Sequence, residues 1–306
     1  MAGTGHDDLK LDSAYFVALE MGHSTLKHAL MEASDLNITQ YRILVKVYAV
    51  SPAPIALVNL SKLLRLKANV VTQATDTLEA KGLVQRRKSV QDARMRMLSM
   101  TEEGLRMIGH VNEALVKRLY AEWPTGNPLY RTSLEACIIA GAAIEPPASD
   151  RIREFPASRT LVSFELIRQT IETAMRKAID APYNDCRILQ RLYEAGNPLR
   201  AVELANQLML PAVTITRATS RLVERGWVQR FSSPDNRRAV FVAVTDEGMK
   251  TASELDRVID RVAYECFWSK LDADHRHALC QVGGIIMEDR RKREEEAVLG
   301  RLQRLG

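Results

Sequence analysis

The sequence predicts a mainly α-helical fold with small β wings, built from two copies of one module. Two observations support this fold class. The 306 residues are about twice the length of a typical domain, and 46% apolar residues are enough for globular cores. The chain also matches itself at a fixed offset, and each copy shows the same order of helical and β periodicities. The sequence therefore predicts two related domains.

An internal repeat spans the middle of each half. A shift of 144 positions aligns residues 60–104 with residues 204–248 without a gap, and 17 of the 45 pairs are identical. Unrelated segments would match at about one position in fifteen. Prolines follow the first copy at Pro146 and Pro147 and recur at Pro156, so a helix cannot continue there. We predict domains at 1–147 and 159–306, joined by a linker at 148–158.

Each copy begins with a long amphipathic helix. Apolar residues at helical spacing are Tyr15, Leu19, Gly22, Leu26 and Leu30 in the first copy, and Phe164, Ile167, Ile171, Met175 and Ala178 in the second. Short helices follow at about 39–50 and 59–64, then a turn and a further helix. Gly82 ends that helix in the first copy, and Gly226 ends it in the second.

A two-stranded β wing follows each of these glycines. Strands are predicted at 84–87 and 95–100 in the first copy, and at 227–231 and 239–244 in the second, with a polar tip between them. Thr101 and Thr245 then resemble N-caps of long helices with acidic first turns. Each copy is thus predicted to be a winged helix-turn-helix domain. We expect the long terminal helices to join the two domains in a pseudo-twofold, dimer-like arrangement.

Composition narrows the possible classes of function. The net charge of +5 is too small to identify a nucleic-acid binder, and the four cysteines lie too far apart for a metal or disulfide motif. No leader pattern and no run of 18 apolar residues occurs, so we expect a soluble, cytoplasmic protein without a membrane partner. The chain lacks a nucleophile elbow, a P-loop and a dinucleotide fingerprint. We assign no catalytic residue, cofactor or metal, and expect no enzyme.

Three motifs occur in the same order in both copies. The first copy has residues 78–86 (LEAKGLVQR), then Asp92-Ala93-Arg94, then residues 98–104 (LSMTEEG). The second has residues 222–230 (LVERGWVQR), then Asp235-Asn236-Arg237-Arg238, then residues 244–248 (VTDEG). This ordered set resembles the MarR family, the regulators of the multiple-antibiotic-resistance type. The resemblance implies a DNA-binding transcriptional regulator.

The resemblance also bears on stoichiometry and ligands. Members of the family usually are separate subunits that dimerise through their terminal helices, so two copies in one chain suggest an intramolecular pseudo-dimer. Whether the fused chain acts as a monomer or self-associates further is left open. Many members bind aromatic acids or other amphipathic effectors between the DNA-binding lobe and the dimer helices. Tyr15, His23, Arg42, Arg168 and Arg187 are the candidate effector-binding residues, although a core tyrosine and surface arginines are the plainer interpretation.

DNA binding is predicted on the second helix of each helix-turn-helix, which enters the major groove, and on the basic wings, which suit phosphates and the minor groove. The resemblance implies that Arg94 and Arg238 lie at the wing tips beside the minor groove. The predicted DNA-binding residues are Asn69, Thr72, Gln73, Arg86, Arg87, Lys88, Arg94 and Arg96 in the first copy, and Thr214, Thr216, Arg217, Arg221, Arg237 and Arg238 in the second. A charged hairpin is also typical of a solvated edge strand.

The two recognition helices differ at matching positions, since Gln73 is replaced by Arg217. An amide suits the major-groove edge of adenine and a guanidinium suits that of guanine, which predicts an imperfect palindromic operator on double-stranded DNA. The expected function is a repressor relieved by a small effector such as an aromatic acid. The alternative is a winged-helix module for protein interaction that has no specific DNA binding.

Overall fold

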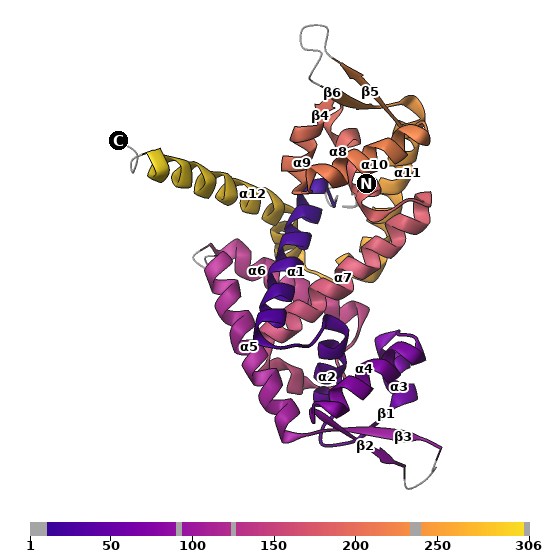
Figure 1. Cartoon of the computed structure of the whole chain (residues 1–306), viewed down its shortest axis with the longest axis vertical. Helices are drawn as coiled ribbons and strands as arrows, with labels where there is room; N and C mark the ends of the chain where they lie inside the picture. Colours follow the sequence, from indigo (N-terminus) through magenta and orange to yellow (C-terminus); the bar gives the residue numbers. More distant parts are fainter. Residues whose placement is uncertain (1–10, 90–93, 124–126, 233–239, 303–306) are drawn as a thin grey trace, which may run out of the picture. The chain divides into compact units, whose positions relative to one another are not determined.

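The computed structural model describes residues 11–89, 94–123, 127–232 and 240–302 (Figure 1). The chain divides into two compact units. The first lobe is Gly22–Ile167, and the second lobe is Met1–Met21 together with Arg168–Gly306. Helices dominate both lobes, and each lobe carries one small antiparallel sheet. The predicted fold class is therefore confirmed.

The first lobe contains the first helix-turn-helix and its wing. Its elements are the larger part of α1 (Ser13–Ala33), α2 (Ile38–Val50), β1 (Ile55–Ala56), α3 (Leu57–Leu64), α4 (Ala68–Ala80), β2 (Val84–Lys88), β3 (Arg96–Met100), α5 (Glu102–Glu122), α6 (Pro128–Ile144), η1 (Asp150–Glu154) and the start of α7 (Pro156–Ile179). The sheet order is β1-β3-β2, with Ile55 opposite Leu98 and Val84 opposite Met100.

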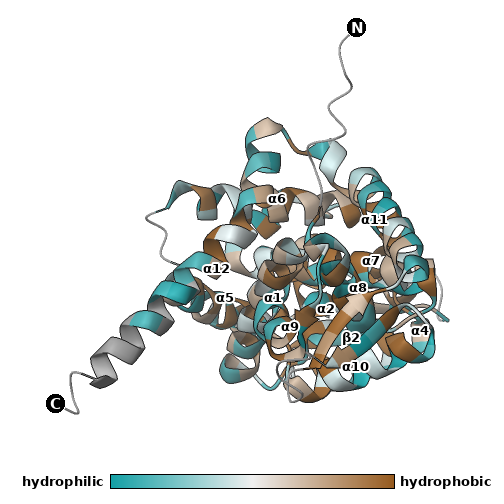
Figure 2. Cartoon of the chain, turned by 90° about the horizontal axis from the view of Figure 1, so that it is seen from above, coloured by the Kyte–Doolittle hydropathy of each residue, from teal (hydrophilic) through white to brown (hydrophobic). Residues whose placement is uncertain are grey.

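The second lobe repeats this order. Its elements are the start of α1, the rest of α7, α8 (Tyr183–Ala195), β4 (Leu199–Arg200), α9 (Ala201–Leu208), α10 (Ala212–Glu224), β5 (Val228–Ser232), β6 (Val240–Val244), α11 (Asp246–Cys266), η2 (Trp268–Lys270) and α12 (Ala273–Leu302). The sheet order is β4-β6-β5, with Leu199 opposite Val242. In Figure 2, hydrophilic residues are prominent along the middle of α12.

Matching residues shape the turns of both lobes. Gly82 and Gly226 end α4 and α10 with φ of 69° and 72°, a region that glycine adopts without steric cost. Thr101 and Thr245 cap α5 and α11, because each hydroxyl accepts the backbone N–H three residues later at 3.0 Å. These predicted stop and cap positions are confirmed.

Each lobe is completed by the start of the other repeat's first helix. In the first lobe, Ser158 of α7 lies 2.7 Å from the Tyr41 hydroxyl and donates to Asn112 at 3.1 Å. In the second lobe, the backbone N–H of Ser13 donates to Glu194 at 2.9 Å. The two repeats therefore contact each other through their first helices inside each lobe, as the prediction of joined terminal helices requires.

Three features differ from the sequence expectations. The wings are three-stranded rather than two-stranded, because β1 and β4 add short third strands whose two residues are too few to give a periodic signal. The segment 148–158 contains η1 and the first turn of α7, which Pro156 begins rather than interrupts. The compact lobes divide the chain differently from the ranges 1–147 and 159–306, since α1 and α7 each extend from one lobe into the other.

Two further observations concern the chain as a whole. All four cysteines are free thiols, and Cys137 and Cys186 are buried. Among the described residues, no helix combines the length and the apolar character that crossing a membrane requires.

Candidate nucleic-acid interface

The helix α4 exposes a polar face opposite its buried face. Val71, Ala74, Thr75 and Leu78 are buried, so the other side of the helix faces outward. The predicted residues Asn69, Thr72 and Gln73 are all exposed on that side. Their spacing of three and four residues places them on one surface, as reading a groove requires.

The helix α10 has the same geometry with different side chains. Thr216 and Arg217 are exposed, and Val213 is 55% exposed at the position that Asn69 occupies in α4. Thr214 is only half-buried and lies about 100° around the helix from Val213, at the edge of this face. The outward position is therefore that of Val213, which the sequence reasoning did not include because its side chain is apolar.

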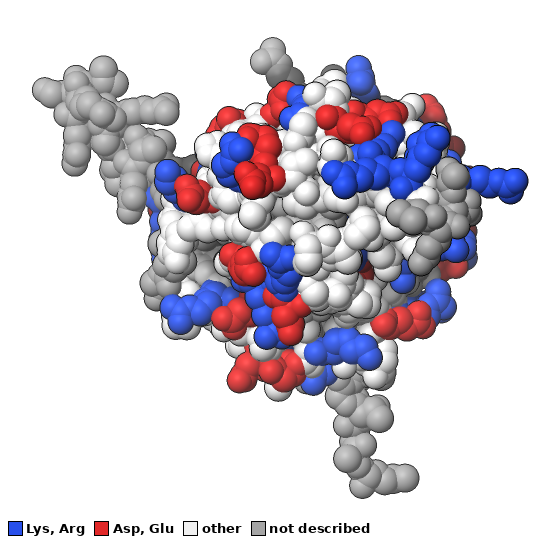
Figure 3. All heavy atoms as spheres, turned by 90° about the horizontal axis from the view of Figure 1, so that it is seen from below, with Lys and Arg blue, Asp and Glu red and all other residues white. Residues whose placement is uncertain are grey.

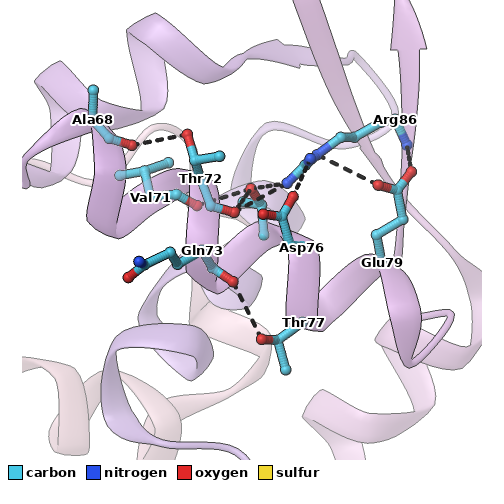
Figure 4. A network of polar contacts seen from close by, with 9 residues as sticks. Ala68, Val71, Thr72, Gln73, Asp76, Thr77, Glu79 and Arg86 are labelled. Atoms are coloured by element: carbon cyan, nitrogen blue, oxygen red, sulfur yellow. Dashed lines mark hydrogen bonds and ion pairs between the residues drawn. The ribbon is translucent and has the colours of Figure 1, made fainter.

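Arg86 of β2 ties the first wing to α4 (Figure 4). Its guanidinium bonds to Asp76 and to the Thr75 hydroxyl, and it donates to the Thr72 carbonyl oxygen at 3.2 Å. Glu79 accepts the backbone N–H of Arg86 at 3.1 Å and lies 3.5 Å from its Nε. Arg86 thus positions the wing, and two carboxylates neutralise its charge.

Arg230 of β5 makes the same connection in the second lobe, where the residues that the structure describes offer it hydroxyl and carbonyl oxygens and no carboxylate. It donates to the Thr216 carbonyl oxygen at 3.0 Å, to the Thr219 hydroxyl, and to the Ser220 hydroxyl at 3.2 Å. Ser220 stands where α4 has Asp76, and Val223 stands where it has Glu79. The sequence reasoning did not single out Arg230, although its identity with Arg86 in the repeat was a usable signal.

The first wing is strongly basic. Arg87, Lys88, Arg94 and Arg96 are all exposed, and a group of blue side chains stands at the right-hand edge of the face in Figure 3. Lys88 and Arg96 lie directly opposite each other on β2 and β3. Like charges in cross-strand positions repel, and an anion placed against them relieves that repulsion. Asp92, the expected partner of Arg94, lies outside the described residues.

The second wing is mostly apolar in its described strands. Phe231 and Phe241 stack with ring centroids 5.9 Å apart, and Phe231 and Val240 are each 43% exposed. Phe231 replaces Arg87, and Val240 replaces Arg96. The predicted tip residues Arg237 and Arg238 lie outside the described part of the chain.

Arg221 has a role within the fold. Its Nε and Nη2 donate to the two carboxylate oxygens of Asp185 at 2.8 and 2.5 Å, and Asp185 is fully buried on α8. A buried carboxylate without this partner would be costly. The contact with Asp185 gives Arg221 a structural role, and DNA binding by Arg221 stays a prediction.

The five candidate effector residues do not gather at one place within a lobe. Tyr15, Arg168 and Arg187 belong to the second lobe, where Tyr15 is buried in the core and both arginines lie 5.7 Å from the Tyr183 ring centroid. His23 and Arg42 belong to the first lobe. His23 Nε2 lies 2.5 Å from Glu165 of α7, and both side chains are buried. These contacts give several members of the set a structural role, and effector binding by the set stays a prediction.

Arg42 also lines a cavity in the first lobe. The cavity has a volume of about 50 Å³ and lies between α2, α6 and α7. Arg42 and Lys46 each donate to Glu145 at 3.0 Å, and all three side chains are largely buried. Arg159 is a third cation at its wall, and burial lowers the pKa of this guanidinium, followed by the charge of Arg153. Arg42 and Lys46 thus share the carboxylate of Glu145, and Arg159 adds a third positive charge to the wall of the cavity.

Comparisons with known proteins agree with this architecture. The MarR family model matches residues 36–95 and 183–240. YpoP, an uncharacterized HTH-type transcriptional regulator of Bacillus subtilis, is 30% identical over 111 residues, which cover 36% of this chain and 77% of YpoP. YhbI, an uncharacterized regulator of the same type and organism, is 33% identical over 148 residues, which cover 42% of this chain and 90% of YhbI.

Among solved structures, a mutant of MarR from Escherichia coli complexed with operator DNA is 24% identical. The match covers 43% of this chain and 94% of that chain, with a TM-score of 0.35.

Proposed function

This chain belongs to the MarR family of DNA-binding transcriptional regulators, and we propose that its two lobes bind one imperfect palindromic operator. The observation that carries this proposal is the pair of outward helix faces on α4 and α10, which share a backbone plan and differ in chemistry. A homodimer of single-copy chains presents two identical helices, whereas a fused chain presents two different ones. The operator arms should therefore be related but unequal.

Gln73 and Arg217 carry the expected difference between the arms. An amide pairs with the N6 and N7 groups of adenine, and a guanidinium pairs with the O6 and N7 acceptors of guanine. Both side chains are exposed at the same position of their helices. Recognition helices of a two-lobed regulator lie about 34 Å apart, one turn of the double helix, which sets the expected spacing of the arms.

A selection of binding sites from random DNA tests this function. The expected product is a consensus with two arms, one of which requires a guanine. Arg217→Gln should remove that requirement from one arm only, and Lys117→Gln, a surface change on α5, should leave the consensus intact. Two equivalent arms that do not change in Arg217→Gln would contradict the proposal. If no sequence is enriched at all, specific DNA binding is absent and a protein-interaction module is the better account.

We further infer that the chain is a repressor whose effector is a small organic acid that binds at the cavity beside Arg42. The support is the positive charge there, since Arg42, Lys46 and Arg159 line the cavity and the first two bind the same carboxylate, that of Glu145. About 50 Å³ is a third of the roughly 150 Å³ of an engineered cavity that binds benzene, so this cavity accepts an acid group but not a whole ring. An aromatic acid would require Glu145 to move.

Acetate, an acid group without a ring, is a suitable probe, with neutral acetamide as its matched control. Acetate should raise the melting temperature of the full chain and release the selected DNA, and acetamide should do neither, because only the anion compensates the cations. Lys46→Gln should abolish both effects of acetate. If acetamide acts as strongly as acetate, or if Lys46→Gln responds like the wild type, this part of the proposal is wrong.

A further inference from the structure

Six exposed cations of the first lobe are absent from the second. They lie on three segments: α3, the turn that follows it, and the wing strands. The pairs are Lys62 and Asn206, Arg65 and Met209, Lys67 and Pro211, Arg87 and Phe231, Lys88 and Ser232, and Arg96 and Val240. Every one of the six first-lobe residues is exposed, so none is needed for a buried contact. All six replacements are uncharged, so these three segments carry less positive charge in the second lobe.

The recognition helices show the opposite change. Asp76 and Glu79 are the only charged residues of α4, and both neutralise Arg86. In α10 these positions are Ser220 and Val223, and Arg217 stands exposed where α4 has Gln73. In the second lobe, positive charge is thus lower at these six positions and higher on the recognition helix.

From this inversion we propose that the two lobes contribute differently to DNA binding. The first lobe supplies most of the phosphate contacts, and the second lobe depends on base contacts through Arg217. This inference rests on the proposed DNA binding, and it adds which lobe anchors the chain and which lobe discriminates between sequences. Phosphate contacts act on any DNA and carry the salt dependence of binding, whereas base contacts separate one sequence from another.

The apolar second wing is consistent with this division. Phe231 and Val240 expose about 43% of their surfaces, on the order of 150 Å² together, given roughly 200 Å² for a phenylalanine. A stable protein interface needs about 800 Å² from each partner, so this described patch is too small to be one. It is large enough for contact with a sugar edge or a thymine methyl group. Self-association through this wing is the competing outcome that the experiment must detect.

The experiment measures the affinity of the full chain for the selected duplex and for a scrambled duplex over a range of salt concentrations. The first-wing variant carries Arg87→Gln, Lys88→Gln and Arg96→Gln. Its slope of log affinity against log salt should fall by about three, at about 0.9 per phosphate contact. Its affinity should fall by the same factor for both duplexes, which leaves the ratio between them unchanged.

Arg217→Gln should have the complementary effect. The ratio of affinities for the selected and the scrambled duplex should fall by roughly 5- to 150-fold, the range expected for one lost bidentate base contact. The salt slope should change by one at most. Scrambling the arm that responds to Arg217→Gln should also weaken binding more than scrambling the other arm.

Two further variants control the result. Lys27→Gln, Lys117→Gln and Arg131→Gln together remove three exposed cations from α1, α5 and α6, and should change neither the slope nor the ratio. Phe231→Arg, Ser232→Lys and Val240→Arg transplant the first wing onto the second and should raise the slope by about three. Circular dichroism melting checks that every variant is folded.

Several results would overturn the division. It is wrong if the first-wing variant lowers the affinity ratio as strongly as Arg217→Gln, or if Arg217→Gln lowers the slope as strongly as the first-wing variant. It is also wrong if Phe231→Ala abolishes a self-association seen by sedimentation and leaves DNA affinity unchanged. If the wild-type chain binds both duplexes equally, the proposed function fails as well, and that outcome is distinct from all the others.

Discussion

The first lobe carries cations on the wing and acidic residues on the recognition helix, whereas the second lobe carries arginines on the recognition helix and mostly apolar residues on the described wing strands. Arg87, Lys88 and Arg96 stand on the first wing, where the second has Phe231, Ser232 and Val240. The positions that form turns, caps and buried contacts are nevertheless the same in both lobes. The difference shows that after duplication the framework stayed fixed while exposed positions diverged.

Arg86 and Arg230 form what we call the arginine clamp, which ties each wing to its recognition helix. Its contacts within the fold are shared by both lobes, and its charged neighbours are not. Arg86 and Arg230 both bind a buried threonine hydroxyl and a carbonyl oxygen of the recognition helix. Only Arg86 also binds carboxylates, from Asp76 and Glu79. The clamp therefore holds the wing in both lobes, and the acidic residues around it adjust the local charge.

The largest predicted loss of stability comes from substitutions at two matching glycines, at which α5 and α11 contact the backbone before each wing. A Cβ at Gly104 would overlap the Leu83 carbonyl oxygen, and one at Gly248 would overlap that of Trp227. Gly104→Ala and Gly248→Ala should each lower the free energy of unfolding by about 2–3 kcal/mol or more, because the wing backbone must shift. Urea unfolding of the full chain measures this. Gly109→Ala, which has open space around it, should be neutral or stabilising by up to about 1 kcal/mol.

The next largest predicted effect is a difference in stability loss between matching positions of the two recognition helices. Arg221→Ala leaves the buried carboxylate of Asp185 unpaired, whereas Thr77→Ala at the matching position removes only a bond from its hydroxyl to the Gln73 carbonyl oxygen. Breaking a buried pair costs about 3–5 kcal/mol, and we expect about 1–2 kcal/mol here because Arg221 is 42% exposed. Thr77→Ala should cost less than about 1 kcal/mol. Equal losses for the two variants in urea unfolding would refute this distinction.

A smaller effect, on DNA affinity, is predicted for a substitution that gives the first lobe a residue of the second. Asp76→Ser gives α4 the residue that α10 has as Ser220, and frees part of the Arg86 charge. Affinity for DNA should rise a few-fold at low salt, and the salt slope should steepen by up to about one. Salt titration of binding checks this, with Asp76→Asn as the isosteric control that should act the same way. A weaker affinity in both variants would mean that Asp76 serves binding directly.

The smallest predicted effect is a pH dependence of the free energy of unfolding. It arises at Glu194, which binds Ser13 at the start of α1. Burial raises the pKa of Glu194, against the hydrogen bonds from Ser13 that lower it. The folded chain therefore holds this proton more tightly than the unfolded chain, so this contribution to stability is present at low pH and is lost as pH rises through the raised pKa. The matching residue of the first lobe is Ala49, whose carbonyl oxygen accepts a hydrogen bond from the Ser149 hydroxyl. A carbonyl oxygen does not titrate, so this contact adds no pH dependence.

The free energy of unfolding should thus gain a contribution as pH is lowered from about 7 to about 5. Glu194→Gln should remove that contribution and should stabilise the chain at neutral pH. Urea unfolding at several pH values measures both effects. An unchanged pH profile in Glu194→Gln would assign the dependence to other groups.

The repeat and the local signals were sufficient to predict most of the fold. The ends of four helices could be predicted because glycine stops and threonine caps depend on neighbouring residues alone. These residues are Gly82, Gly226, Thr101 and Thr245. The exchange of helix starts between the lobes was not predictable in detail, since it depends on contacts such as Tyr41 with Ser158, 117 positions apart. The third strand of each wing also depends on distant pairing, of Ile55 with Leu98.

The candidate site was predicted in part for similar reasons. Exposure of Asn69, Gln73 and Arg217 followed from helical periodicity. The role of Arg221 did not, because its partner Asp185 belongs to a helix 36 positions earlier and no pattern connects the two. Arg230 was not singled out, although the repeat matches it to Arg86, and both arginines bind the recognition helix of their own lobe.

Interference mapping on the selected operator tests the division between the lobes most directly. Ethylation of phosphates blocks phosphate contacts, and methylation of guanine N7 blocks a guanidinium contact in the major groove. We predict that interfering phosphates cluster on one arm of the operator and that the interfering guanine lies on the other arm, where Arg217→Gln abolishes its effect. Phosphate and guanine interference of equal strength on both arms would contradict the account.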